Sequence, residues 1–203
     1  MTLSGCGGRR IGLLGGSFNP AHDGHRHISL LALKVLALDE IWWLVSPQNP
    51  LKPNEGMAPF PERLAEARKA ARHPRIKVSA IEQRLGTRFT ADTLKALARR
   101  GPGRRFVWIM GADNLRQIDR WQRWTDIFQG VPVAVFDRPT YCYKALAGLA
   151  AHRYRRDRLP DREARLLAGR KPPAWCFIPA AKHPASATEI RSRRARQIAA
   201  TGP

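Results

Sequence analysis

The chain has 203 residues, 43% of them hydrophobic, which is enough to build the core of one domain. No apolar run approaches the roughly 20 residues of a membrane span, and the N-terminus lacks the order of a signal peptide. We therefore expect a cytoplasmic protein with no membrane partner. The net charge of +20 attracts anions in general, but it does not by itself indicate specific nucleic-acid recognition.

The three cysteines, Cys6, Cys142 and Cys176, are far apart and odd in number, and none belongs to a CxxC pair. This pattern indicates neither a disulfide framework nor a cysteine-based zinc site. We expect reduced thiols, with Cys176 buried in an apolar strand.

Strand-like and helix-like segments alternate along the chain. Strands are predicted at Arg10–Leu14, Glu40–Ser46, Arg75–Ala80, Arg105–Met110, Val131–Phe136 and Trp175–Ile178. Helices are predicted at 24–38, 61–72, from an N-cap at Thr90 to Arg99, at 113–128, as a basic helical stretch over 144–169, and at 188–199. This alternation predicts an α/β fold, a doubly wound and mostly parallel sheet with helices on both faces. No repeat or domain boundary is visible, so one domain is expected over residues 1–203.

Unusual polar clusters follow the predicted strands. They occupy residues 15–25, 47–53, 111–113, 137–139 and 179–191. Ligands of doubly wound sheets bind beyond the carboxyl ends of the strands, so these clusters are expected to meet there and form a site.

The first cluster, residues 15–25, reads GGSFNPAHDGH. Gly15 and Gly16 are expected to allow unusual backbone angles and the close approach of a phosphate to a helix N-terminus. His22 and His25 are three residues apart and would share one face of the first turn, where two imidazole donors could hold an oxyanion. Two other interpretations are that the histidines cap the helix, or that they bind zinc with His27; the second is disfavoured because His25 and His27 would diverge on a helix.

The segment GGSFNPAHDGH resembles the GGTFDPxHxGH element of the HxGH nucleotidyltransferase superfamily. Within that superfamily the chain is similar to bacterial nicotinate-nucleotide adenylyltransferases over residues 10–198. The remaining motifs follow in the family's order: the loop Pro47–Lys52, Thr90–Leu94 for TxDTL, Gly111–Leu115 for the GxD turn, Trp121 eight residues after Asp113, the Arg138-Pro139 pair, and Ser186–Arg191 for SSTxIR.

The resemblance implies a Rossmann-like nucleotidyltransferase domain that transfers AMP from ATP to nicotinate mononucleotide. It implies catalytic roles for His22, His25 and Arg191. It implies that ATP is bound by Gly15, Gly16, Ser17, Phe18, His22, His25, Gly111, Ser186, Thr188 and Arg191. It implies that nicotinate mononucleotide is bound by Asn49, Lys52, Thr90, Asp113, Trp121 and Arg138. Mg²⁺ is expected to be held mainly by phosphates rather than by side chains.

Taken alone, the residues also allow structural roles for some of these positions: Trp121 could be a core tryptophan, and Asp113 could cap the helix that it opens. The chain departs from the family pattern at Ser17, Asn19, Phe89 and Ala187, and the last change removes a hydroxyl from the triphosphate element.

Two alternative functions remain. One is another enzyme of the superfamily, such as pantetheine-phosphate adenylyltransferase, which typically has threonine in place of His22. The other is a basic nucleic-acid-binding protein on a degenerate fold, which the intact histidine pair and Arg191 disfavour. We expect no specific nucleic-acid partner, and a monomer or homodimer.

Overall fold

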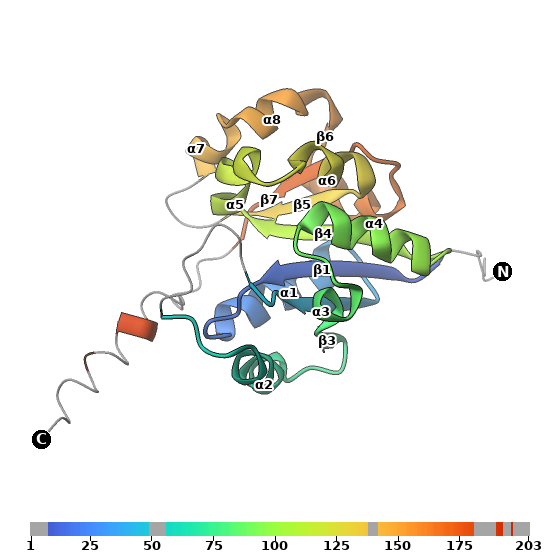
Figure 1. Cartoon of the computed structure of the whole chain (residues 1–203). Helices are drawn as coiled ribbons and strands as arrows, with labels where there is room; N and C mark the ends of the chain where they lie inside the picture. Colours follow the sequence, from blue (N-terminus) through green and yellow to red (C-terminus); the bar gives the residue numbers. More distant parts are fainter. Residues whose placement is uncertain (1–7, 49–55, 138–141, 181–189, 193–195, 197–203) are drawn as a thin grey trace, which may run out of the picture.

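The computed structural model describes residues 8–48, 56–137, 142–180, 190–192 and 196. Its centre is one sheet of seven strands in the order β3-β2-β1-β4-β5-β7-β6 (Figure 1). The six strand pairs in this part of the chain are all parallel. The strands are β1 (Arg10–Gly16), β2 (Glu40–Val45), β3 (Ile76–Ser79), β4 (Arg105–Gly111), β5 (Val133–Phe136), β6 (Arg158–Leu159) and β7 (Trp175–Ile178).

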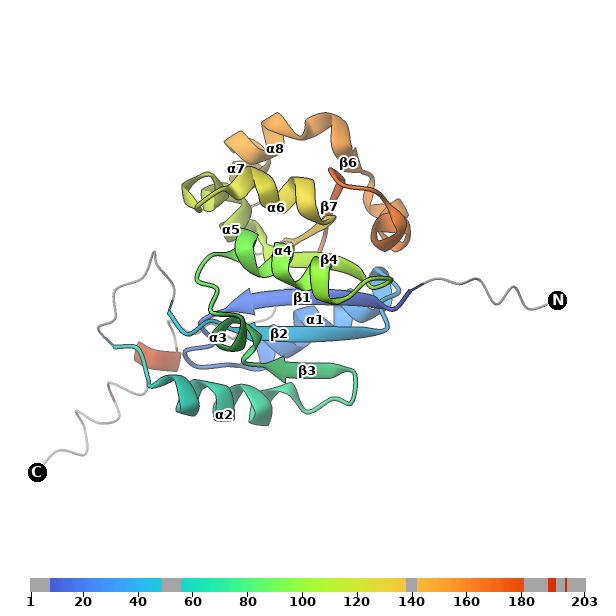
Figure 2. The ribbon, with the colours of Figure 1, turned by 45° about the vertical axis from the view of Figure 1, so that its right-hand side comes forward.

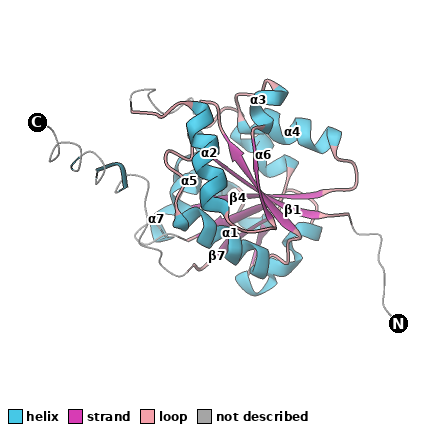
Figure 3. Ribbon diagram, turned by 90° about the horizontal axis from the view of Figure 1, so that it is seen from below, coloured by secondary structure: helices cyan, strands magenta, loops and turns pink. Residues whose placement is uncertain are grey.

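Helices cover both faces of the sheet, as Figure 2 shows for α4 in front of the strands and α1 behind them, and as Figure 3 shows from below. The α-helices are α1 (Asp23–Val35), α2 (Phe60–Ala71), α3 (Ile81–Leu85), α4 (Thr90–Arg100), α5 (Ala112–Gln117), α6 (Trp124–Gly130), α7 (Cys142–Leu146) and α8 (Leu149–Arg153). The 3₁₀ helices are η1 (Ile118–Arg120), η2 (Arg155–Asp157) and η3 (Asp161–Gly169).

The core consists of two apolar layers, one on each face of the sheet. Successive side chains of a strand point to opposite faces of the sheet, and β4 shows the result. Trp108 and Met110 pack with α4, α5 and α6, whereas Val107 and Ile109 pack with α1, α2 and η3. Cys176 is fully buried in β7, as predicted. The doubly wound sheet with helices on both faces is therefore confirmed, and its described strand pairs are parallel throughout.

Two of the long predicted helices are wrong. The helix predicted at 113–128 is interrupted at 121–123, where Trp121 is extended and Arg123 adopts a left-handed φ of 51°. The stretch predicted at 144–169 divides into α7, α8, η2, β6 and η3. Gly148 and Pro160 are extended at its breaks, and a proline inside a helix would remove one of its hydrogen bonds.

Smaller differences concern the ends of elements. Thr90 is the first residue of α4 rather than its N-cap, which is Phe89. The short helix α3 was not predicted. Of the helix predicted at 188–199, residues 190–192 and 196 are helical and the others lie outside the described residues. Among the described helices, none has the length and apolar character that crossing a membrane requires.

Candidate active site

The direction of the strand order reverses between β1 and β4, because β2 and β3 lie on one side of this pair and β5, β7 and β6 on the other. This switch point is where a doubly wound sheet opens a crevice for ligands. A small pocket lies there, lined by Leu14, Gly24, His25, Ile28, Gly111 and Phe136. His25 and Gly111, both predicted to bind ATP, are thus brought together from segments far apart in the sequence.

The glycines that end β1 do not have the unusual backbone angles expected of them. Neither Gly15 nor Gly16 has a positive φ; the left-handed residue of this turn is Phe18, with a φ of 48°. Gly15 is needed for packing, because a Cβ there would lie 2.3 Å from Cη2 of Trp108. The prediction that these two glycines supply unusual backbone angles is therefore wrong.

Helix α1 begins with a capping box made of two histidines. His22 is the N-cap, and its Nδ1 accepts a hydrogen bond from the backbone N–H of Gly24 at 3.1 Å. Nδ1 of His25 accepts from the backbone N–H of His22 at 3.3 Å. The more usual box pairs a serine or threonine with a glutamate, and here imidazole nitrogens do the same work. The capping interpretation of these histidines is confirmed.

Capping also fixes how each imidazole can act on a ligand. A ring that accepts at Nδ1 carries its proton on Nε2, so that nitrogen is a donor. The centroids of the His22 and His25 rings are 4.0 Å apart, as their shared helix face predicted. Capping and ligand binding are therefore compatible, because they use different nitrogens of the same rings.

Buried aromatic side chains support the histidine pair. The ring of Phe18 lies 4.8 Å from that of His25 and stacks on Trp43 at 5.0 Å. Ser29 donates to the carbonyl of His25 at 2.8 Å and accepts from the indole N–H of Trp43 at 2.8 Å. Since the Phe18 side chain is only 2% exposed, it supports His25. Its predicted contribution to ATP binding would have to come from its backbone.

Arg191 reaches the same turn from the far end of the chain. Its Nη1 donates to the backbone carbonyl of Asn19 at 2.6 Å, across 172 residues of sequence. In Figure 1 the segment that carries it lies on the side toward which β1 points. The side chain of Asn19 holds the segment before α2, donating to the carbonyl of Gly56 and accepting from the N–H of Ala58.

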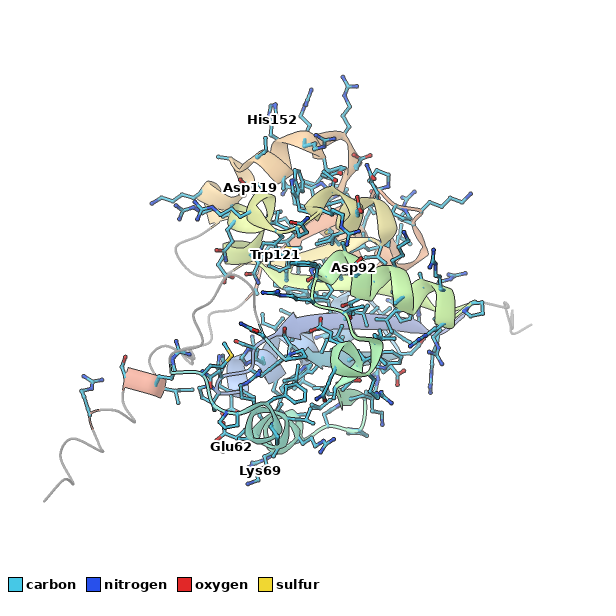
Figure 4. The ribbon with its side chains drawn as sticks, in the orientation of Figure 1. Glu62, Lys69, Asp92, Asp119, Trp121 and His152 are labelled. Carbon is cyan, nitrogen blue, oxygen red and sulfur yellow. The ribbon has the colours of Figure 1, made fainter. Side chains whose placement is uncertain are left out.

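Three of the residues predicted for the second substrate, Thr90, Asp113 and Trp121, are described, and they belong to the elements on the α4, α5 and α6 side of the sheet. Trp121 is partly buried against the core cluster of this face, at the break between η1 and α6. Arg123, two residues later, pairs with Asp92 on the first turn of α4, which begins at Thr90. Figure 4 shows Trp121 and Asp92 near each other in front of the sheet. Asp113 lies on the first turn of α5, where Gly111 is the N-cap.

Among the described residues, three charged side chains that the sequence reasoning did not single out are buried: Glu40, Arg63 and Glu82. Arg63 in α2 is 2% exposed and Glu82 in α3 is 6% exposed. Burial raises the pKa of the Glu82 carboxyl to about 7, and hydrogen bonds with Ser46 and Thr93 partly oppose this rise. The sequence offers one signal for Arg63. It lies four residues before the buried Ala67, so it is a charged residue at a helix position where an apolar one is expected.

Five predicted site residues lie outside the described residues: Asn49, Lys52, Arg138, Ser186 and Thr188. Within the described ranges, no three histidine, cysteine, aspartate or glutamate side chains gather as metal ligands.

A parallel sheet with a histidine-capped helix at its switch point is typical of nucleotide-binding folds. Comparisons with known proteins identify the family. The sequence profile of the family described as "Cytidylyltransferase-like" matches residues 13–193, which places the chain among the nucleotidyltransferases. A protein of Parvibaculum lavamentivorans is 55% identical over 186 residues, which are 92% of each chain. One of Bradyrhizobium sp. is 54% identical over 183 residues, or 90% of this chain and 95% of the relative.

Both relatives carry the name "Probable nicotinate-nucleotide adenylyltransferase". At this identity and coverage, the chain belongs to the nicotinate-nucleotide adenylyltransferase family. A solved structure supports the fold: the Plasmodium falciparum nicotinic acid mononucleotide adenylyltransferase complexed with NaAD has a TM-score of 0.66 at 17% identity. The match covers 91% of this chain and 83% of the other.

Proposed function

We propose that this chain transfers AMP from ATP to nicotinate mononucleotide, giving deamido-NAD and pyrophosphate. A phosphate oxygen of nicotinate mononucleotide forms the new bond to the α-phosphorus of ATP. The bond from that phosphorus to the oxygen bridging to the β-phosphate breaks, and pyrophosphate leaves with its electron pair. The nucleophile is already an anion, so no base has to remove a proton, and catalysis rests on alignment and charge stabilisation.

The observation that carries the proposal is the histidine pair at the switch point. Charge accumulates on the oxygens around the α-phosphorus in the transition state, and the Nε2 donors of His22 and His25 would stabilise it there. Both rings are held by the helix they cap, and His25 by buried aromatic packing as well. Donors fixed in advance in this way need no reorganisation during the reaction.

The residues around the pair would hold the rest of ATP. Gly15, Gly16, Ser17, Phe18 and Gly111 would contact it through their backbones, which lie at the ends of β1 and β4. Arg191 would bind the β- and γ-phosphates with Ser186 and Thr188, by bidentate and hydroxyl contacts.

Mg²⁺ would arrive on the triphosphate oxygens, and it would neutralise charge on the departing pyrophosphate. This fits the chemistry of the residues proposed for the phosphates: the histidine pair and Arg191 offer no carboxylate to a metal, and magnesium is commonly carried by substrate phosphates.

Nicotinate mononucleotide would occupy the α4 and α6 side of the site. The face of Trp121 would stack on the pyridine ring, and Asp113 would accept hydrogen bonds from ribose hydroxyls. Thr90 would meet polar groups of the mononucleotide, and Arg138, Asn49 and Lys52 its carboxylate and phosphate. Three further points stay predictions: that the chain is a single domain, that it is a monomer or homodimer, and that it works in the cytoplasm.

The test is a substrate comparison on the purified full chain. Pyrophosphate release from ATP with Mg²⁺ is measured with nicotinate mononucleotide, nicotinamide mononucleotide and phosphopantetheine in turn. We expect the highest kcat/KM with nicotinate mononucleotide. Turnover only with phosphopantetheine, or none with any of the three, would overturn the proposal.

A further inference from the structure

Arg63 is a buried cation whose contacts are made with the backbone of the loops around the site. It lies on the first turn of α2, and its guanidinium sits 5.5 Å from the ring centroid of Phe60. Burial lowers the pKa of the guanidinium from its ordinary value. Burying a charge is strongly unfavourable unless the charged group is hydrogen-bonded. The buried guanidinium of Arg63 therefore needs hydrogen-bond acceptors around it.

Those contacts are four hydrogen bonds to carbonyl oxygens on three segments. Nη1 donates to Ser17 at 2.6 Å, in the turn after β1, and to Ser46 at 2.8 Å, directly after β2. Nη2 donates to Pro47 at 2.7 Å. Nε donates to Ala58 at 2.9 Å, in the segment that leads into α2.

The segments that Arg63 joins belong to different halves of the proposed site. The end of β1, the turn after it and the start of α1 hold the residues proposed for ATP, from Gly15 to His25. Ser46 and Pro47 follow β2 directly, and they precede in sequence Asn49 and Lys52, which are proposed for the mononucleotide and lie outside the described residues. The guanidinium therefore connects the backbones of two loops that would each bind one substrate.

Only arginine has the donors for this connection. The guanidinium presents five N–H groups in a planar fork, so one side chain can reach four carbonyls in different directions. A lysine ammonium has three donors on a single atom and cannot span them.

We infer that Arg63 is a positioning residue that couples the ATP loop to the mononucleotide loop, so that ordering of one loop by its substrate also orders the other. The inference rests on the proposed function for the assignment of the loops. Two ligands that order the same linked backbone assist each other, because the second finds part of the ordering already done.

The first test is the substitution Arg63→Lys, which keeps the charge and removes the fork. Arg68→Lys is the matched control, because Arg68 is exposed on the same helix. We expect Arg63→Lys to raise KM about tenfold for both ATP and nicotinate mononucleotide, as expected for a lost charged hydrogen bond, and the control to leave both unchanged. A residue that only stabilises the fold would lower kcat with the folded fraction and leave both KM values alone, and that result would overturn the inference.

The second test starts from the wild-type chain, whose result alone can overturn the inference. Hydrogen exchange of the wild-type chain is followed with α,β-methylene ATP and without it. We expect slower exchange both in the turn after β1 and around Pro47, with the second effect lost in Arg63→Lys. Protection confined to the turn after β1 in the wild type would overturn the coupling. This measurement uses no mononucleotide, so it decides the role of Arg63 even if nicotinate mononucleotide is not turned over and the proposed function fails.

Discussion

Replacing His22 and His25 with asparagine separates the two roles that the structure gives these side chains. Asparagine is a good N-cap, and its amide oxygen can take the place of the ring Nδ1 at either position. Each variant therefore keeps an acceptor where Nδ1 accepts from a backbone N–H, at 3.1 Å for His22 and 3.3 Å for His25. The asparagine amide is shorter than the imidazole ring, so neither variant places an N–H donor where Nε2 lies. The alanine variants of the same residues lose both functions.

The two roles affect different measured quantities: capping changes the free energy of unfolding, and donation in the transition state changes kcat. Loss of a cap costs about 1 kcal/mol of stability, so the alanine variants should be destabilised by about that amount and the asparagine variants by only a few tenths. Loss of one transition-state donor costs about 10²- to 10³-fold in kcat. We therefore expect His22→Asn and His25→Asn to be nearly as stable as the wild type and at least about 10²-fold slower. The double variant should lose less than the product, since both donors would act on one developing charge.

The assay pairs urea unfolding with pyrophosphate release at saturating ATP and nicotinate mononucleotide. His152→Gln serves as the control, because His152 lies on α8, far from α1 in Figure 4, and should change neither quantity. If His25→Asn or His22→Asn kept more than about a tenth of the wild-type kcat, the histidines would be helix caps alone, and the catalytic argument would be refuted.

Three further predictions concern packing, burial and substrate binding. Gly15→Ala should lower the free energy of unfolding by about 1–3 kcal/mol in urea, because its Cβ would lie 2.3 Å from the Trp108 ring, whereas Gly130→Ala, which meets nothing within 4 Å, should not; equal effects would contradict this. The Glu82 carboxyl binds its proton more tightly in the folded than in the unfolded chain, so its contribution to stability is present below pH 4.5 and lost as the pH rises through about 7. The free energy of unfolding of Glu82→Gln should equal that of the wild type at pH 4 and exceed it by up to about 3 kcal/mol at pH 8. Parallel pH profiles of the two proteins would argue against a buried carboxyl. Trp121→Ala should raise KM for nicotinate mononucleotide about tenfold with KM for ATP unchanged, and Trp121→Phe should retain most of the affinity; an equal rise for both substrates would indicate a core role instead.

The fold could be predicted from the sequence because its main signals are local. Apolar strands such as Trp175–Ile178 and amphipathic helices such as Asp23–Val35 can each be recognised from their own residues, and their alternation leaves few possible sheets. The failures arose where a tertiary contact decides the backbone. Arg123 takes a left-handed φ and pairs with Asp92 on another helix, so nothing within 113–128 announces the interruption.

The histidine pair illustrates the limits of reading a site from spacing. Three-residue spacing correctly placed His22 and His25 on one face, and the sequence presented capping and ligand binding as alternatives. Only the hydrogen bonds show that each ring caps through Nδ1, which leaves the two roles compatible. The glycines failed for a related reason: Gly15 is required by Trp108, 93 positions away in the sequence, rather than by the conformation of its own turn.

Residues that bind backbone are harder to predict than residues that bind ligand. His25 and Arg191 belong to motifs because their chemistry faces a substrate. Arg63 satisfies carbonyl groups, and every residue has one, so the sequence of its partners carries no trace of the contact. The same holds for Asn19, whose side chain contacts backbone atoms of Gly56 and Ala58 and whose carbonyl accepts from Arg191. A substitution at Arg63 or Asn19 should therefore change how the substrate loops are held while every motif of the family stays intact.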